Sequence, residues 1–343
     1  MSAVDLIQTN LLSPAVLCFV LGALAVVAKS DLRLPDTVFA ALAMYLMFSI
    51  GLKGGAELAH ADLASVSVPI AGAVLLSAAI PLWCYAGLRR FFGLSTPDAA
   101  AIAAHYGSVS AVTFAAVVAF LDRQAIPFEG YAAALLAVME VPAIVIAIGL
   151  ARAAQASGAL AVHGGGSAAL SLGSRPDLRS GGMGMVLAEI LSSKSILLLV
   201  GGLAIGALAG PGSLAKVKPF FADLFPGALC LFLLELGRMA ASRAGAFRTV
   251  GLPLLAFAIL MPVAHAGLGL GVAYVAGLSL GGAVILATLA ASASYIAAPA
   301  AVQLALPEAD AGLYLTCALA VTFPFNIVVG LPLYQAMAGA LYG

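Results

Sequence analysis

Two short runs of small and hydroxyl-bearing residues carry the clearest chemistry in this sequence. The first is His105-Tyr-Gly-Ser-Val-Ser-Ala-Val-Thr113, and the second is Ala291-Ser-Ala-Ser-Tyr-Ile-Ala-Ala-Pro299. Each run lies within a long apolar stretch, where Gly, Ser and Pro are typical of a broken helix whose freed backbone groups need a local partner or a ligand. Close packing between intact helices uses the same small residues, but their recurrence in both halves of the chain favours broken helices.

Two broken helices would bring complementary partial charges to one point. The N–H groups and the positive dipole end at the start of a half-helix favour an anion, whereas carbonyl and hydroxyl oxygens at the same break suit a small cation. We therefore predict an anion site at Gly107, Ser108, Val109, Ser110, Ser292, Ala293, Ser294 and Tyr295.

A sodium site is predicted beside the anion. Glu140 lies within an apolar stretch, and Pro142 frees a backbone carbonyl in the preceding turn. A carboxylate and a free carbonyl suit sodium, although a Glu that pairs with a neighbouring helix for structure is the alternative. Thr322 and Asn326 occupy the corresponding place in the second half, where polar packing is an equal alternative. The predicted sodium ligands are Ser110, Thr113, Glu140, Ser294, Thr322 and Asn326.

The composition requires a lipid bilayer around these runs. The chain has 343 residues, of which 63% are hydrophobic and 9% charged, and its mean hydropathy is +1.13. Soluble domains carry roughly a quarter charged residues. The zero net charge argues against nucleic acid as a partner. The sequence contains no HExxH or GxSxG motif and no cluster of His and Cys, so we expect no enzyme and no cofactor beyond a coupling ion.

Stretches without Asp, Glu, Lys or Arg predict ten transmembrane helices, since a span needs about 20 apolar residues. They are 6–28, 37–52, 63–88, 99–121, 130–151 with Glu140 inside, 195–215, 224–237 with Glu235 inside, two spans within 249–307, and 311–343. A turn is predicted within 249–307 at Gly277-Leu-Ser-Leu-Gly-Gly282. The predicted fold class is an all-α integral membrane protein.

The two halves of the chain can be aligned as a repeat. The alignment pairs Gly22 with Gly202, Pro81 with Pro262, Gly93-Leu-Ser95 with Gly277-Leu-Ser279, and Pro142 with Pro324. An odd number of spans per repeat inverts the second copy in the membrane, as in many secondary transporters. We predict a first five-helix repeat at 1–153, a flexible cytoplasmic linker at 154–188, and a second, inverted repeat at 189–343. The fourth helix of each repeat would be broken at membrane depth.

Lys and Arg residues predict the orientation. The even-numbered loops hold only Lys53, Arg123, Lys216 and Lys218, and the other Lys and Arg residues lie in the odd-numbered loops. Because cytoplasmic loops are enriched in Lys and Arg, both termini are expected outside the cytoplasm and the Gly- and Ser-rich linker inside. The linker either tethers the repeats or docks a cytoplasmic regulator.

Three segments resemble the SbtA family of sodium-dependent bicarbonate transporters. They are Ile50-Gly-Leu-Lys-Gly-Gly55, Gly107-Ser-Val-Ser-Ala-Val-Thr-Phe-Ala-Ala116 and Met139-Glu-Val-Pro-Ala143. The run from Ala291 to Pro299 matches in position, and the resemblance extends through nearly all ten spans. It implies a homotrimer in which a core domain moves against a gate domain. With both termini outside the cytoplasm, we expect a bacterial inner membrane and periplasmic termini. The resemblance also implies bicarbonate between the broken helices, sodium beside it, and control by a PII-like partner, SbtB.

The sequence departs from that family at Tyr295. In the cyanobacterial members an acidic residue follows the Ser-rich run, whereas Tyr295 follows Ser294 here. A phenol is neutral at physiological pH and offers one oxygen. One of two sodium sites is therefore expected to be missing or to be built from neutral oxygens.

Other polar residues within the spans have simpler expected roles. His105 is more often a packed, hydrogen-bonded residue than a proton relay. Glu235 is expected to pair with Arg238, one turn further on. Lys53 is expected to reach the membrane surface, and a role in drawing anions inward is the weaker alternative.

The predicted function is sodium-coupled uptake of bicarbonate by a secondary transporter. One alternative keeps the scaffold and changes the substrate to another small anion or monocarboxylate, coupled to sodium or, through Glu140 or His105, to protons. A second alternative is a membrane receptor that binds an anion without transporting it.

Overall fold

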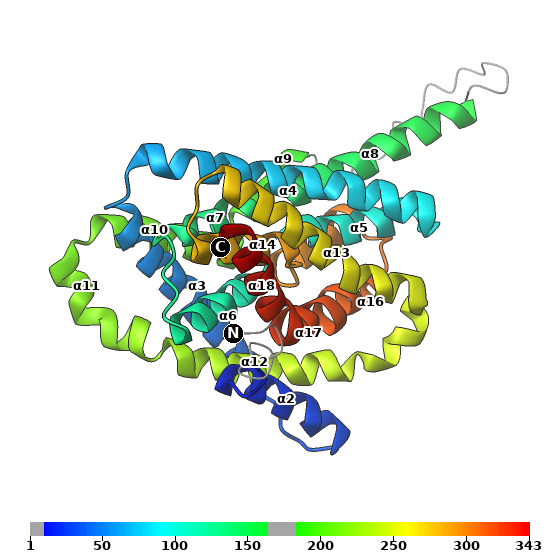
Figure 1. The fold of residues 1–343 in the computed structure, drawn as a ribbon. Coiled ribbons are helices and arrows are strands. Elements are labelled where there is room, and N and C mark those ends of the chain that lie inside the picture. Colours follow the sequence, from blue (N-terminus) through cyan, green and yellow to red (C-terminus); the bar gives the residue numbers. More distant parts are fainter. Residues whose placement is uncertain (1–9, 164–182) are drawn as a thin grey trace.

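Seven helices in the described part of the chain are long and apolar enough to cross a membrane. The computed structural model describes residues 10–163 and 183–343, and every regular element within them is helical (Figure 1). The candidate spans are Asp36–Leu58, Ala64–Phe91, Thr96–Arg123, Ala132–Gln155, Gly212–Ala246, Val250–Val275 and Ala311–Tyr342. Shorter apolar helices lie at Pro14–Val27, Lys194–Leu208 and Leu280–Ala291. The prediction of an all-α, multi-pass membrane protein is confirmed.

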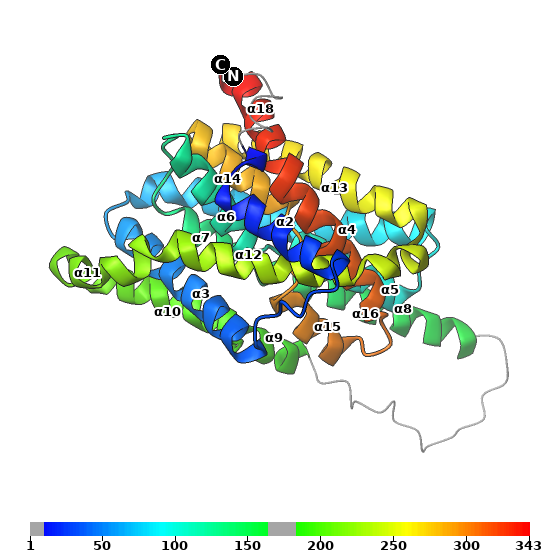
Figure 2. The same cartoon turned by 90° about the horizontal axis from the view of Figure 1, so that it is seen from below.

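Four helices form two closely packed pairs. Helix α2 (Pro14–Val27) packs along α12 (Phe225–Ser242), and α3 (Asp36–Leu58) packs along α10 (Lys194–Leu208) (Figure 2). A Cβ on Gly237 would lie 1.9 Å from the Phe19 carbonyl oxygen, and one on Gly51 would lie 2.4 Å from the Leu199 carbonyl oxygen. Glycine at these positions lets the helix backbones touch, which holds each pair together tightly.

A second group of helices surrounds the two predicted breaks. It comprises α4 (Leu63–Phe91), α5 (Thr96–Gly107), α6 (Ala111–Arg123), α7 (Ala132–Met139), α8 (Pro142–His163), α13 (Phe247–Val275), α14 (Leu280–Ala291) and α15 (Ala297–Ala305). Helix α4 packs on α5 and α8, and α13 packs on α14 (Figure 1). Both flanking helices, α4 and α13, contain two internal prolines, which remove backbone N–H donors and bend a helix.

Both predicted helix breaks are present. Helix α5 ends at Gly107 and α6 begins at Ala111, so Ser108–Ser110 are extended between them. Helix α14 ends at Ala291 and α15 begins at Ala297. A third interruption separates α7 from α8 at Glu140 and Val141, because Pro142 cannot donate the hydrogen bond that would continue the helix.

Carboxylates join the outer ends of the two broken helices. Glu129, in the α6–α7 loop, accepts hydrogen bonds from the Ser279 N–H at 2.6 Å and from the Ser279 hydroxyl at 3.2 Å, at the start of α14. Asp98, in the first turn of α5, accepts a hydrogen bond from the Asp310 N–H at 2.8 Å, in the α15–α16 loop. Each broken helix is therefore tied to the connection that follows the other one.

The last span alternates between α-helical and π-helical geometry. It runs through α16 (Ala311–Leu315), a π-helical segment at Thr316–Thr322, α17 (Phe323–Phe325), a second π-helical segment at Asn326–Gly330, and α18 (Leu331–Tyr342). Each π-helical segment ends two residues before a proline, the first before Pro324 and the second before Pro332. Since proline removes a backbone donor and crowds the preceding turn, local rewinding is expected there.

The expected linker at 154–188 is helical at both of its described ends. Helix α8 continues to His163, and α9 (Met183–Leu191) begins at residue 183. The sequence before His163 is rich in alanine, the strongest helix former, which accounts for the longer helix. Residues 164–182, the centre of the expected linker, lie outside the described residues. The division into two repeats and a linker stays a prediction.

Helix α11 (Pro211–Lys218) and a π-helical turn at Pro219–Asp223 connect α10 to α12.

Candidate functional site

The two helix breaks cross and bond to each other directly. The backbone N–H of Ser110, in the first break, donates to the Ser292 hydroxyl at 2.9 Å. The backbone N–H of Ser294, in the second break, donates to the His105 carbonyl oxygen at 2.8 Å. These two bonds hold the breaks together. Seven of the eight predicted anion-site residues lie on the breaks, and the eighth, Gly107, is the last residue of α5 directly before the first one.

The serine hydroxyls divide into two kinds. Ser110 is the N-cap residue of α6 and accepts from the Thr113 N–H, and Ser294 accepts from the Ala298 N–H in the first turn of α15, each at 3.2 Å. Both hydroxyls therefore satisfy a free N–H group at the start of a half-helix. Ser108 and Ser292 instead donate their own protons, to the Glu140 carbonyl at 3.0 Å and the Leu289 carbonyl at 2.8 Å. The capping serines, Ser110 and Ser294, therefore keep an O–H that can be turned toward a ligand.

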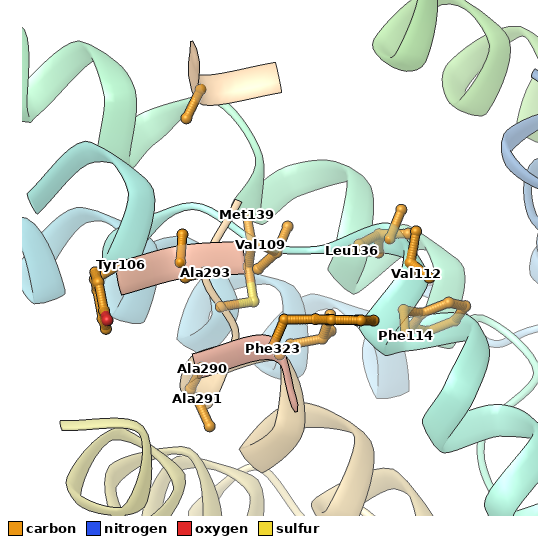
Figure 3. Packing of buried hydrophobic residues seen from close by; sticks show 14 of the residues in the cluster. Tyr106, Val109, Val112, Phe114, Leu136, Met139, Ala290, Ala291, Ala293 and Phe323 are labelled. Carbon is orange, nitrogen blue, oxygen red and sulfur yellow. The ribbon is translucent and has the colours of Figure 1, made fainter. Parts of the chain in front are cut away.

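Apolar side chains enclose the crossing. Val109 in the first break and Ala293 in the second are both buried, and Figure 3 shows them in one cluster with Met139 and Phe323. Thr113, in the first turn of α6, is buried as well. Hydrogen bonds and partial charges act more strongly in such low-dielectric surroundings than in water. The half-helix dipoles and capping hydroxyls would therefore act on a ligand with little screening.

Tyr295 borders the second break. Its ring packs edge-on against Phe323, with centroids 5.2 Å apart. Its buried hydroxyl lies near the side chain of Ser110 and makes no hydrogen bond with the described residues. The Tyr295 phenol therefore places a neutral oxygen and an O–H donor between the breaks, at the position where the family that the sequence resembles has a carboxylate.

Glu140 lies at the interruption between α7 and α8. Its side chain is 5% exposed, and its Oε2 atom has no hydrogen-bond partner among the residues that the structure describes. Ser108 binds the Glu140 carbonyl, and Ser77 of α4 donates to the neighbouring Met139 carbonyl at 2.6 Å. A buried, unpaired carboxylate oxygen is costly, so this group is suited to a cation or a proton.

Thr322 and Asn326 are fully hydrogen-bonded to structural partners. The Thr322 hydroxyl donates to the Ala258 carbonyl at 2.7 Å and bonds to the Tyr106 hydroxyl at 2.6 Å. The Asn326 amide donates to the Ala291 carbonyl at 2.9 Å, at the end of α14, and its oxygen accepts from Tyr334 at 2.7 Å. Both residues brace a break, and their role as sodium ligands stays a prediction.

Gly107 is held between two neighbouring helices. A Cβ there would lie 2.5 Å from the Pro81 ring of α4 and 2.7 Å from the Ala143 side chain of α8. This close approach places the C-terminal end of α5 against the α7–α8 interruption. It explains why a glycine, and no larger residue, ends the half-helix there.

Two other polar residues have structural partners. The His105 ring is fully buried, its Nδ1 bonds to the Ala101 carbonyl at 2.6 Å, and it packs at a tilt against Tyr314 with ring centroids 4.5 Å apart. Its Nε2 has no partner within the described residues. Glu235 accepts from Arg238 at 2.8 Å and from the Leu34 N–H at 3.1 Å, which confirms the predicted ion pair.

Sequence reasoning missed three buried hydroxyls that brace the site, those of Ser77, Tyr106 and Tyr334. Tyr106 stands next to Gly107, and Ser77 stands one turn before Pro81, so their positions beside helix interruptions were a usable signal. Tyr334 carried no such signal, because its bond to Asn326 depends on the π-helical geometry between them.

A cavity of about 660 Å³ lies beside the first break. Its lining comes from α2, α3, α6 and α12 and includes Val16, Ser49, Phe114 and Leu229. Of the described residues around it, those of the predicted anion site do not contribute to the wall, but Phe114 follows Thr113 directly.

These features define a multi-pass helical membrane protein whose interior holds two crossed helix breaks. The model of the Na+-dependent bicarbonate transporter superfamily matches residues 14–339, and the chain belongs to this family. The resemblance seen in the sequence is thereby confirmed. A search of curated proteins finds no match to the chain.

Proposed function

We propose that this protein is a secondary transporter that takes up bicarbonate together with sodium. Membership of the bicarbonate transporter superfamily supports the substrate. The proposal depends above all on two hydrogen bonds, which join Ser110, at the start of α6, to Ser292, at the end of α14, and Ser294, just before α15, to the end of α5. With both breaks held together in this way, the starts of α6 and α15 lie close to one buried region. Two half-helix starts together favour one small anion.

In the proposed site, the Ser110 and Ser294 hydroxyls donate to the bicarbonate oxygens. Both already cap a half-helix through their lone pairs, so their protons are free to turn toward the anion. The N–H groups in the first turns of α6 and α15 add further donors and positive dipole ends. The Tyr295 hydroxyl closes the site from the second break.

Sodium would bind on the side of the first break. Glu140 supplies the negative charge, and Ser110 and Thr113 supply neutral oxygens in the first turn of α6. Sodium there would offset the charge of Glu140 and of the neighbouring bicarbonate, so each ion would favour binding of the other. Thr322, Asn326 and Ser294 would add only neutral oxygens.

An inverted repeat and a two-domain movement fit the helix contacts. Helix α2 packs on α12 and α3 on α10, so the first helix of each proposed repeat pairs with the second helix of the other. These four helices would form the gate domain. The group that carries the breaks, tied at its outer ends by Glu129 and Asp98, would move as the core domain. We also propose ten transmembrane spans, namely the seven long candidate spans and the three shorter apolar helices of the described residues.

The assembly and location follow from the family resemblance. We infer a homotrimer in a bacterial inner membrane with periplasmic termini, in which the segment 154–188 faces the cytoplasm. A PII-like regulator that acts on that face belongs to the same proposal.

Proton coupling is the second candidate mechanism. It is favoured by two buried atoms without partners in the described part of the chain, Glu140 Oε2 and His105 Nε2. Both are groups that exchange protons readily. Under this alternative a pH gradient, rather than a sodium gradient, would drive anion uptake.

Uptake of radiolabelled bicarbonate into proteoliposomes tests the proposal. An inward sodium gradient is expected to accelerate uptake over an equal choline gradient at fixed pH. Equal uptake in both, with stimulation by a pH gradient, would support proton coupling. Saturable binding without flux would identify a receptor instead.

A further inference from the structure

The cavity beside the first break follows α6 for most of its length. Its lining on this helix runs from Phe114, in the first turn after the break, to Arg123, the last residue of the helix. On the opposite side it is lined by Ser49, Lys53 and Glu57 of α3. Spaced four residues apart, these three side chains share one face of the helix. The cavity therefore leads from a charged end toward the crossed breaks.

Ser49 is a buried polar group that faces this cavity without a partner. Its side chain is 3% exposed, and its hydroxyl makes no hydrogen bond with the described residues. The Tyr45 hydroxyl beside it donates to the Phe220 carbonyl, so toward Ser49 it offers only a weakly placed acceptor lone pair. A buried hydroxyl normally has a partner, so its presence here points to a ligand or water in the cavity.

Two cations line the same cavity without a paired carboxylate. Lys53 lies over the Phe128 ring, 5.9 Å from its centroid, and Arg123 bonds to the neutral Ala119 carbonyl at 3.3 Å. Within residues 10–163 and 183–343, the ion pairs join other residues, Arg33 to Asp36 and Arg238 to Glu235. Both cations can therefore meet an anion that enters from solvent.

Two acidic residues, Glu57 and Asp122, also line the cavity. Together with Lys53 and Arg123 they bring the summed formal charge of the lining to zero. With no net charge, the lining can attract a small anion only locally, beside Lys53 and Arg123, and does not hold it tightly. A larger polyanion would meet the acids as well as the bases.

We propose that this cavity is an access site for a small monovalent anion, which the Lys53 ammonium and the Ser49 hydroxyl hold before it reaches the crossed breaks. Arg123 is the second cation of the site. The identification of the anion as bicarbonate rests on the proposed function. The presence of an anion-attracting site rests on the cavity itself.

Cys230 offers a native reporter, because it lines the cavity and its thiol is free. The experiment uses the purified full-length protein with Cys18→Ala, so that Cys230 remains the accessible thiol beside the buried Cys84 and Cys317. Labelling rates are measured with two methanethiosulfonates, one carrying a sulfonate and one a trimethylammonium group. The ratio of the two rates cancels the intrinsic reactivity of the thiol, and a Cys18→Ala/Cys230→Ala protein gives the background.

Lys53→Gln is expected to lower the ratio of anionic to cationic labelling by about threefold or more, since one positive charge is lost from the wall. Lys53→Arg should keep the ratio. Lys216→Gln, on the exposed helix α11 away from the cavity, is the matched control and should also keep it. Concentrated salt should shrink the difference between wild type and Lys53→Gln. An equal ratio in wild type and Lys53→Gln would overturn the access site.

Protection experiments separate this inference from the proposed function. Bicarbonate is expected to slow labelling of Cys230 in wild type more than chloride at equal ionic strength, and Ser49→Ala should reduce that protection. If the ratio of anionic to cationic labelling depends on Lys53 but bicarbonate does not protect Cys230, the cavity attracts anions and bicarbonate is not its occupant. Protection that is unchanged in both Lys53→Gln and Ser49→Ala would overturn their assignment as the holding groups.

Discussion

Each helix break contains two serines, but the two breaks differ in the residues that hydrogen-bond to their surroundings. At the first break Ser108 bonds to the Glu140 carbonyl, and the Glu140 carboxylate has an oxygen without a partner in the described residues. At the second break the Ala291 carbonyl is bound by the neutral amide of Asn326, and Tyr295 stands after the serines. The negative charge therefore belongs to the first break alone.

This difference separates the roles of the two breaks. Among the described residues, the buried acids are Glu140 and Glu235, and Glu235 is paired with Arg238. A bare cation at membrane depth needs a compensating charge. In the proposed site, sodium therefore binds beside the first break. The anion lies between the two breaks, where Ser110 and Ser294 both face it, and the second break adds structural support.

The largest expected effect comes from removing the charge at the first break. Glu140→Gln keeps the shape of the side chain and should abolish the sodium stimulation of bicarbonate uptake, because no other unpaired buried acid is found in the described part of the chain to replace it. Sodium titrations of uptake in proteoliposomes measure this. Glu57→Gln, an acid of the cavity wall, is the matched control and should keep its sodium dependence. Normal sodium dependence in Glu140→Gln would make Glu140 structural.

The capping serines should show the next largest effect and should behave alike at the two breaks. Ser110→Ala and Ser294→Ala each remove a hydrogen bond to a charged ligand, worth about 1.5–3 kcal/mol, so bicarbonate affinity should fall at least about tenfold. Ser108→Ala is the comparison, because its proton is already given to the Glu140 carbonyl. It should lower thermal stability more than intrinsic affinity. Unchanged bicarbonate affinity in both Ser110→Ala and Ser294→Ala would show that the anion does not bind between the two breaks.

Gly107→Ala tests the packing that fixes the first break. The added methyl would meet the Pro81 ring and the Ala143 side chain, and overpacking of this kind costs about 1–3 kcal/mol. The second break has an alanine, Ala291, at the end of its half-helix, so it already accommodates a Cβ. Thermal unfolding in detergent should show a lower midpoint for Gly107→Ala. Gly339→Ala, where a Cβ would meet nothing within 4 Å, should leave the midpoint unchanged.

The sequence predicted both breaks because runs of Gly, Ser and Pro recur inside an apolar stretch in both halves of the chain, whereas a single run would be explained as well by close helix packing. It also predicted that Glu235 would pair with Arg238, since three-residue spacing brings the two side chains together on a helix. These features depend on residues close together in the chain. They could therefore be predicted without the tertiary structure.

The braces around the breaks could not be predicted in the same way. The bonds from Ser77 to Met139 and from Asn326 to Ala291 join helices that are far apart in the sequence. The direction of each hydroxyl also decides its role, and Ser108 and Ser110 differ in direction although they are two residues apart. The local sequence treats them as equivalent, whereas packing against α7–α8 sets Ser108 apart.

Tyr295→Phe should give the smallest effect and sharpens the difference between the breaks. Loss of the hydroxyl removes one neutral donor at the crossing, worth about 1 kcal/mol, so bicarbonate affinity should fall roughly fivefold. The sodium affinity should change less, because the phenol carries no charge. The sodium-concentration dependence of uptake, measured in wild type and Tyr295→Phe, checks this. A steep dependence on at least two sodium ions that weakens in Tyr295→Phe would make Tyr295 a sodium ligand.

Equilibrium binding of radiolabelled bicarbonate to the purified protein tests the central claim most directly, because it reports the site without requiring transport. We expect saturable binding that is tighter in sodium than in choline at constant ionic strength, and that is lost in Ser110→Ala/Ser294→Ala while the protein remains folded. Binding of equal affinity in the double variant, or binding in wild type that is indifferent to sodium, would contradict a sodium-coupled bicarbonate site at the crossed breaks.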